Sequence, residues 1–237
     1  MATNPDVLSG SPSNLGGYLD GILRHREDYF SRIFDNKNVL RHAGMLLLIV
    51  FVLTGLHGLA IGYSSGYLQM LSTAVKLPLL YLLTTVVCFP VLYVVNVIIG
   101  SRLGFIQTYT LILMSLALNA ILLASCAPIV LFFILTGASY TFLKLLEVGI
   151  LGFSGLWAMV GLWRGLVEMC ETSSLYPKRA IRILQIWIVV FGLVGLQMTW
   201  VMRPFVGSPN MPFELFRETG KGNIYEDIAS SVSNFLD

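Results

Sequence analysis

The feature that most constrains this chain is the stretch from Lys76 to Arg102, KLPLLYLLTTVVCFPVLYVVNVIIGSR, which has no charged residue between its two ends. A helix rises about 1.5 Å per residue, so roughly 20 apolar residues cross the hydrocarbon core of a bilayer. Pro78 and Pro90 are compatible with such a helix, because neighbouring helices in a membrane satisfy the backbone groups that proline leaves unpaired. The stretch predicts a membrane-spanning helix.

The composition extends this prediction to the whole chain. Of the 237 residues, 56% are hydrophobic and only 12% are charged, whereas about 25% of the residues in a soluble domain are charged. The net charge is +2, and there is no basic patch with interleaved aromatic residues, which argues against nucleic acid as a partner. The three cysteines lie far apart without a CxxC pair, which argues against a disulfide framework. We therefore expect a multi-pass membrane protein.

Four further segments share the apolar character of the first. We expect an all-α polytopic membrane bundle of five transmembrane helices, with short links such as Tyr63–Val75 between them. The expected spans are 43–63, 76–100, 103–136, 140–168 and 183–202.

The third of these spans is unusually long for one upright crossing. Residues 103–136 form an uncharged run that, as one straight helix, would measure about 50 Å. The run is either one tilted span that kinks near Pro128 or two short crossings. The distribution of basic residues favours one crossing with a broken end.

Polar segments flank the expected transmembrane domain, residues 43–203. We expect residues 1–14 to be a disordered tail, residues 15–42 to hold a cytoplasmic amphipathic helix, and residues 204–237 to be a non-cytoplasmic segment with a short helix. An amphipathic helix with aromatic residues on its apolar face is typical of the membrane interface, and a docking helix for a partner protein is the alternative. The residues expected to contact membrane or partner are Tyr18, Leu19, Ile22, Tyr29, Phe30, Ile33, Phe34, Phe213 and Phe216.

The basic residues predict the orientation of the chain. With five crossings, ten of the 15 Lys and Arg residues lie on the side of the N-terminus and five on the other side. Cytoplasmic loops carry the excess of Lys and Arg. This rule places the N-terminus in the cytoplasm and the C-terminus on the opposite side.

Three residues define a possible path through the membrane. His57 lies within the first span, and a histidine there can relay protons or line a pathway. We favour instead a packed imidazole, because we expect no acidic residue at mid-membrane and expect Glu147 to pair with Lys144 on its own helix. With Asn119 and a helix break at Pro128, His57 would otherwise line the path of a small channel or transporter subunit.

Small residues predict where helices approach closely. Gly161 and Gly165 form a GxxxG pattern, and rows of glycines in the fourth and fifth spans permit tight packing. We expect these rows to meet each other, or to form a contact between two copies of the chain. The residues are Gly149, Gly152, Gly155, Gly161, Gly165, Gly192 and Gly195.

No enzyme signature accompanies the membrane pattern. The sequence has no Walker loop, HExxH, GxSxG or dinucleotide fingerprint. We therefore expect no catalytic residue, no metal site and no cofactor other than bound lipid, and a lipid-modifying enzyme is our third hypothesis.

The five-span pattern resembles the Yip family of membrane proteins of trafficking compartments. The stretch KLPLLYLLTTVVCFPVLYVVNVIIG, with its early Lys-Leu-Pro and its mid-span Phe-Pro, is similar to the second span of that family. The resemblance covers about residues 43–203 and implies a non-catalytic membrane organiser, whose eukaryotic relatives interact with small GTPases. We expect a structural or organising subunit of a membrane assembly, or a trafficking or membrane-shaping factor, whose partners are lipids and other membrane subunits or further copies of the chain.

Overall fold

The computed structural model describes residues 15–24, 38–172, 178–202 and 233, and these form an all-α bundle. A short helix precedes five long ones. The elements are α1 (Leu15–Arg24), α3 (Val39–Gly62), the 3₁₀ turn η2 (Tyr63–Ser65), α4 (Tyr67–Ile98), α5 (Phe105–Leu135), α6 (Tyr140–Thr172) and α7 (Lys178–Val201).

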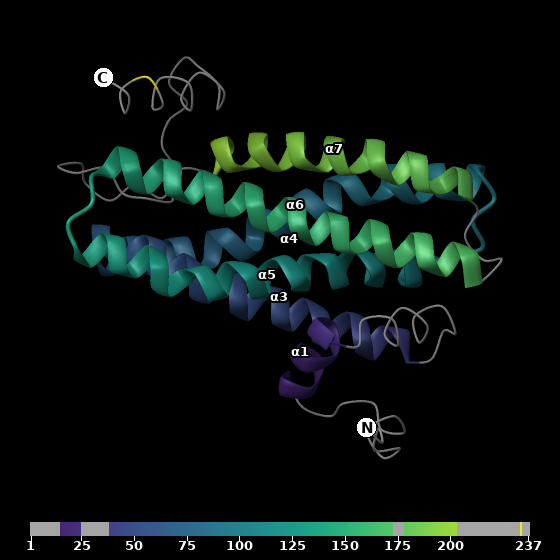
Figure 1. The fold of residues 1–237 in the computed structure, drawn as a ribbon, viewed down its shortest axis with the longest axis horizontal. Helices are drawn as coiled ribbons and strands as arrows, with labels where there is room; N and C mark the ends of the chain where they lie inside the picture. Colours follow the sequence, from purple (N-terminus) through teal and green to yellow (C-terminus); the bar gives the residue numbers. More distant parts are fainter. Residues whose placement is uncertain (1–14, 25–37, 173–177, 203–232, 234–237) are drawn as a thin grey trace.

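The five long helices run alternately up and down the long axis of the molecule (Figure 1). α3 packs against α4 and α5, α6 packs against α5, and α7 packs against α4 and α6. As a result, the start of α3 and the end of α7 lie at opposite ends of the bundle (Figure 1). The indole Nε1 of Trp187 on α7 donates a hydrogen bond to the backbone oxygen of Cys88 on α4, at 3.0 Å.

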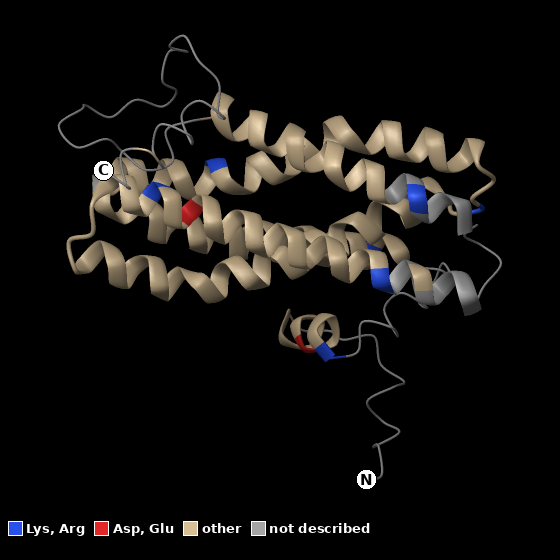
Figure 2. Cartoon of the chain, turned by 45° about the horizontal axis from the view of Figure 1, so that its top comes forward, with Lys and Arg blue, Asp and Glu red and all other residues tan. Residues whose placement is uncertain are grey.

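Four of the described helices are long and apolar enough to cross a membrane. They are Val39–Gly62, Tyr67–Ile98, Phe105–Leu135 and Tyr140–Arg164. α7 contains a shorter apolar stretch, Gln185–Val201, so the fifth crossing stays a prediction. Charged residues lie toward the two ends of the bundle, with a long uncharged stretch between them (Figure 2).

Two sequence-based expectations about α4 and α5 are wrong. α4 begins at Tyr67 rather than at Lys76, because Gln69 and Thr73 turn inward as part of the helix and are buried. α5 is one continuous helix through Pro128, without the expected break. A proline removes only one backbone donor, and hydrogen bonds on either side hold the helix together.

Three glycines of α3 allow a close approach between α3 and α4. A Cβ atom at Gly58 would lie 2.6 Å from the backbone oxygen of Thr73, and one at Gly62 would lie 2.5 Å from Cα of Met70. A Cβ at Gly55 would lie 3.2 Å from the oxygen of Ala74. Only glycine permits backbones to pack this closely, and Gly58 and Gly62 themselves form a GxxxG pattern.

The glycines of α6 and α7 do not form the expected tight contact with one another. A Cβ at Gly149, Gly152 or Gly192 would meet nothing within 4 Å. Cβ atoms at Gly155 and Gly195 would make ordinary contacts, both at 3.8 Å, with Asn119 and Thr84. The role of these rows between two copies of the chain stays a prediction, as does that of Gly161 and Gly165.

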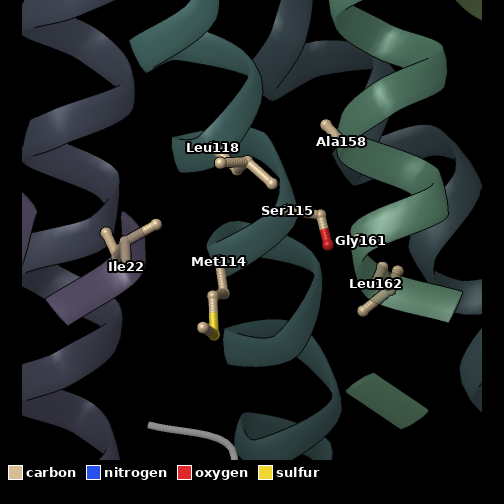
Figure 3. Close-up of a pocket in the computed structure, with 7 residues that line it drawn as sticks. All are labelled: Ile22, Met114, Ser115, Leu118, Ala158, Gly161 and Leu162. Carbon is tan, nitrogen blue, oxygen red and sulfur yellow. The ribbon is translucent and has the colours of Figure 1, made fainter. Parts of the chain in front are cut away.

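α1 docks on the side of the bundle at α3 and α5. The Tyr18 hydroxyl and Nδ1 of His42 on α3 are 3.0 Å apart, and Tyr18 and Ile22 are buried. Ile22 also lines a small cavity between α5 and α6, of about 10 Å³, with room for about one water molecule (Figure 3). Part of the apolar face that we expected to meet lipid or a partner is therefore covered by the protein itself.

Candidate functional site

A buried acid–base pair joins α3 to α6. Nε2 of His57 lies 3.1 Å from Oε1 of Glu147, and the two residues are 0% and 8% exposed. The expectation that His57 has no acidic partner is therefore wrong, whereas the pairing of Glu147 with Lys144 on its own helix stays a prediction. Glu147 was missed because its partner is 90 residues away in the chain.

The helix ends explain why these two side chains meet. His57 lies five residues before the end of α3, and Glu147 lies seven residues after the start of α6. These two ends lie at the same end of the bundle (Figure 1). At 1.5 Å per residue, both side chains are therefore about 8 to 10 Å inside that end.

A second polar pair lies in the interior, formed by Tyr81 on α4 and Asn119 on α5. Nδ2 of Asn119 donates a hydrogen bond to the Tyr81 hydroxyl at 3.3 Å, and both residues are buried. The Glu147 carboxylate interacts electrostatically with Tyr81. Four helices, α3 to α6, thus each contribute one polar side chain to this region.

Three atoms of these residues are buried without a hydrogen-bond partner among the described residues. They are Nδ1 of His57, Oε2 of Glu147 and Oδ1 of Asn119. More than nine-tenths of buried polar groups in proteins have a partner, so three unsatisfied atoms in one region are unusual. The described side chains of the protein therefore leave three hydrogen-bonding positions unfilled in this region.

Only two of the three expected pathway residues lie in this interior. His57 and Asn119 are buried, each in a hydrogen-bonded pair. Pro128 is exposed on the outside of α5 and does not belong with them. Besides Glu147, sequence reasoning missed Tyr81 at the site, because its position in an apolar span gives no distinctive signal.

The other predicted contact residues divide into two groups. Tyr18 and Ile22 are buried against the bundle, and Leu19 is half-buried. The remaining six lie outside the described residues: Tyr29, Phe30, Ile33, Phe34, Phe213 and Phe216.

Within the described ranges, no three His, Cys, Asp or Glu side chains come close enough to hold a metal ion. Comparisons with protein-family models, with curated proteins and with solved structures found no match. The chemistry of the region therefore has to be argued from its own residues.

Proposed function

We propose that this protein crosses the membrane five times, with the start of α3 facing the cytoplasm and the end of α7 on the other side. α7 packs against α4, and the Trp187 indole donates a hydrogen bond to the Cys88 oxygen on α4. The basic residues of the described long helices and links are distributed six to two between the ends. The six are Arg41, Arg102, Arg164, Lys178, Arg179 and Arg182, and the two are Lys76 and Lys144.

We further propose that it is a non-catalytic membrane subunit that organises an assembly by helix packing. The observation that carries this proposal is one face of α6. Gly149, Gly152, Phe153, Leu156 and Trp157 recur at spacings of three and four, and all are exposed.

The shape of this face suits another helix. The rings of Phe153 and Trp157 are stacked, with centroids 6.1 Å apart, and the two glycines beside them leave open space. Small residues next to large ones let a second transmembrane helix approach closely. The resemblance to the Yip family points in the same direction, toward a membrane organiser in trafficking or membrane shaping.

The experiment replaces Gly149 and Gly152 by leucine in the full chain and measures its assembly in nanodiscs. A Cβ atom at either position meets nothing within 4 Å, so we expect the bundle to fold and the added bulk to separate the helices of the assembly. We expect the wild type to purify with a second copy or another subunit and the variant to lose it. Gly44→Leu, at an equally open position on α3, is the matched control. Wild-type protein that runs as a single copy without any other protein would contradict the proposal.

A small channel or transporter subunit is the second candidate, and the buried pair of His57 and Glu147 favours it. Ionisable residues inside membranes often mark ion or proton pathways. Proton flux into liposomes that carry the protein, compared with His57→Ala, tests this candidate. Flux that requires His57 supports it, and the absence of flux in the wild type contradicts it.

A further inference from the structure

We propose that His57 and Glu147 form a proton-binding site within the membrane-embedded bundle. The inference rests on the geometry of the pair and holds for an organising subunit as well as for a transporter. Its ligand is a proton, taken up by the pair as one unit.

The net charge of the pair depends on whether a proton is bound. With the proton bound, the pair is either an imidazolium next to a carboxylate or a neutral imidazole next to a carboxylic acid, and both forms are neutral overall. Without it, a neutral imidazole faces a carboxylate, and one negative charge remains in the interior. An uncompensated buried charge costs several kcal/mol, so the proton count of the pair and the packing around it are linked.

In the part of the chain that the structure describes, one atom of each side chain in the pair is buried without a hydrogen-bond partner. Nδ1 of His57 and Oε2 of Glu147 have no partner among the described residues, although both are buried. Each has an unused position for a proton or for a hydrogen bond from water. A histidine whose two nitrogens were both fixed by backbone carbonyls would have no such capacity.

The charged surroundings allow the proton to leave. On α6, Lys144 lies one turn from Glu147, and on α4, Lys76 is buried in the same half of the bundle as Tyr81. α5 contributes Asn119 and has no acidic or basic residue, and the basic residues of α7 lie at its start, at the opposite end. Positive charges on this side of the bundle would reduce the cost of the lone carboxylate.

The depth of the site provides access. His57 and Glu147 are about 8 to 10 Å from the end of the bundle that holds the α3–α4 and α5–α6 links. A proton from the solution on that side has a short way to travel. We therefore expect the site to respond to the pH on that side of the membrane.

The test is a nuclear magnetic resonance titration of the full chain, labelled with ¹⁵N-histidine, in phosphatidylcholine nanodiscs. The chain has three histidines, and His57→Gln assigns the signal of interest. In a titration from about pH 5 to about pH 9, we expect the His57 ring signals to respond to pH in the wild type and to respond differently in Glu147→Gln. His42→Gln, on the same helix but paired with Tyr18, leaves the His57 titration unchanged.

Two results would overturn the proposal. One is a His57 ring that keeps a single protonation state across this range in the wild type, a result that needs no variant to fold. The other is a His57 midpoint that stays the same in Glu147→Gln. If the glutamine variant does not fold, Glu147→Asp, which keeps a carboxylate, is measured in its place.

Discussion

Nε2 of His57 and Oε1 of Glu147 lie 3.1 Å apart, although the two residues are separated by 90 positions in the chain. Each side chain is buried, so each depends on the other for its polar contact. This contact links α3, the first long helix of the bundle, to α6, the fourth.

Replacing one member of this pair should destabilise the fold more than replacing both. His57→Leu leaves Glu147 as a buried carboxylate without its partner, which costs about 3 kcal/mol. The double variant His57→Leu with Glu147→Leu should recover part of this loss, because neither polar group remains. Unfolding of the purified protein in detergent measures the differences in free energy.

Thr54→Val is the matched control for this experiment. Thr54 lies one turn from His57 and is equally buried, but its hydroxyl bonds to the backbone oxygen of Val50 in its own helix. The change should cost less than about 1 kcal/mol. Equal losses in the control and in His57→Leu would show that the pair does not stabilise the bundle.

The pair shows where sequence reasoning reaches its limit. Uncharged runs marked α4 and α5 as apolar helices, since a span is a local property of about 20 residues. The partner of a buried histidine is a property of the tertiary fold, and nothing near His57 pointed to Glu147. We expected no acidic residue at mid-membrane, whereas Glu147 is buried two turns into α6.

The GxxxG spacing of Gly58 and Gly62 is a sequence signal for close helix packing that our expectations did not include. Gly58 and Gly62 follow the same GxxxG spacing as Gly161 and Gly165, and a Cβ at either of the first two would lie against the backbone of α4. Spacing alone does not say which face of a helix meets a neighbour. Pro128 shows the same limit of local sequence patterns. α5 is unbroken there, because the effect of a proline depends on the hydrogen bonds around it.

Gly58→Ala should destabilise the contact between α3 and α4. The added Cβ would lie 2.6 Å from the Thr73 oxygen and 2.9 Å from Cα of Ala74, so two backbones have to separate. Overpacking of this kind costs about 1–3 kcal/mol. Thermal unfolding in detergent measures the loss.

Gly44→Ala provides the comparison on the same helix, because a Cβ there meets nothing within 4 Å. Alanine favours helix over glycine by about 1 kcal/mol in water, so this variant should be neutral or slightly more stable. If Gly58→Ala unfolds at the same temperature as Gly44→Ala, the close approach of α3 and α4 is wrong.

Tyr18→Phe should loosen α1 without removing its packing. The ring remains in place, while the hydrogen bond between the hydroxyl and His42 is lost, which costs about 1 kcal/mol. Hydrogen–deuterium exchange of residues 15–24 should rise several-fold. Leu23→Ala changes an exposed side chain of the same helix and should leave the exchange unchanged; an equal rise in both variants would argue against the docking of α1 through Tyr18.

Trp187→Phe should weaken the attachment of α7 to α4. Phenylalanine retains most of the buried ring but cannot donate a hydrogen bond to the Cys88 oxygen, so about 1 kcal/mol is lost. Protease sensitivity of α7 in mild detergent should increase. Trp157→Phe, at an exposed position on α6, should not change it, and a similar increase there would mean that the Trp187 bond contributes nothing specific.

We propose that the chain crosses the membrane five times with its two ends on opposite sides. The most direct measurement labels single cysteines, in a variant without Cys88, Cys126 and Cys170, with a reagent that does not cross membranes. In intact cells, Ser64→Cys and a cysteine added after Asp237 should react, whereas Ser101→Cys should react only after the membrane is opened. Reaction of Ser64→Cys and Ser101→Cys from the same side, or protection of the C-terminal cysteine in intact cells, would contradict the account.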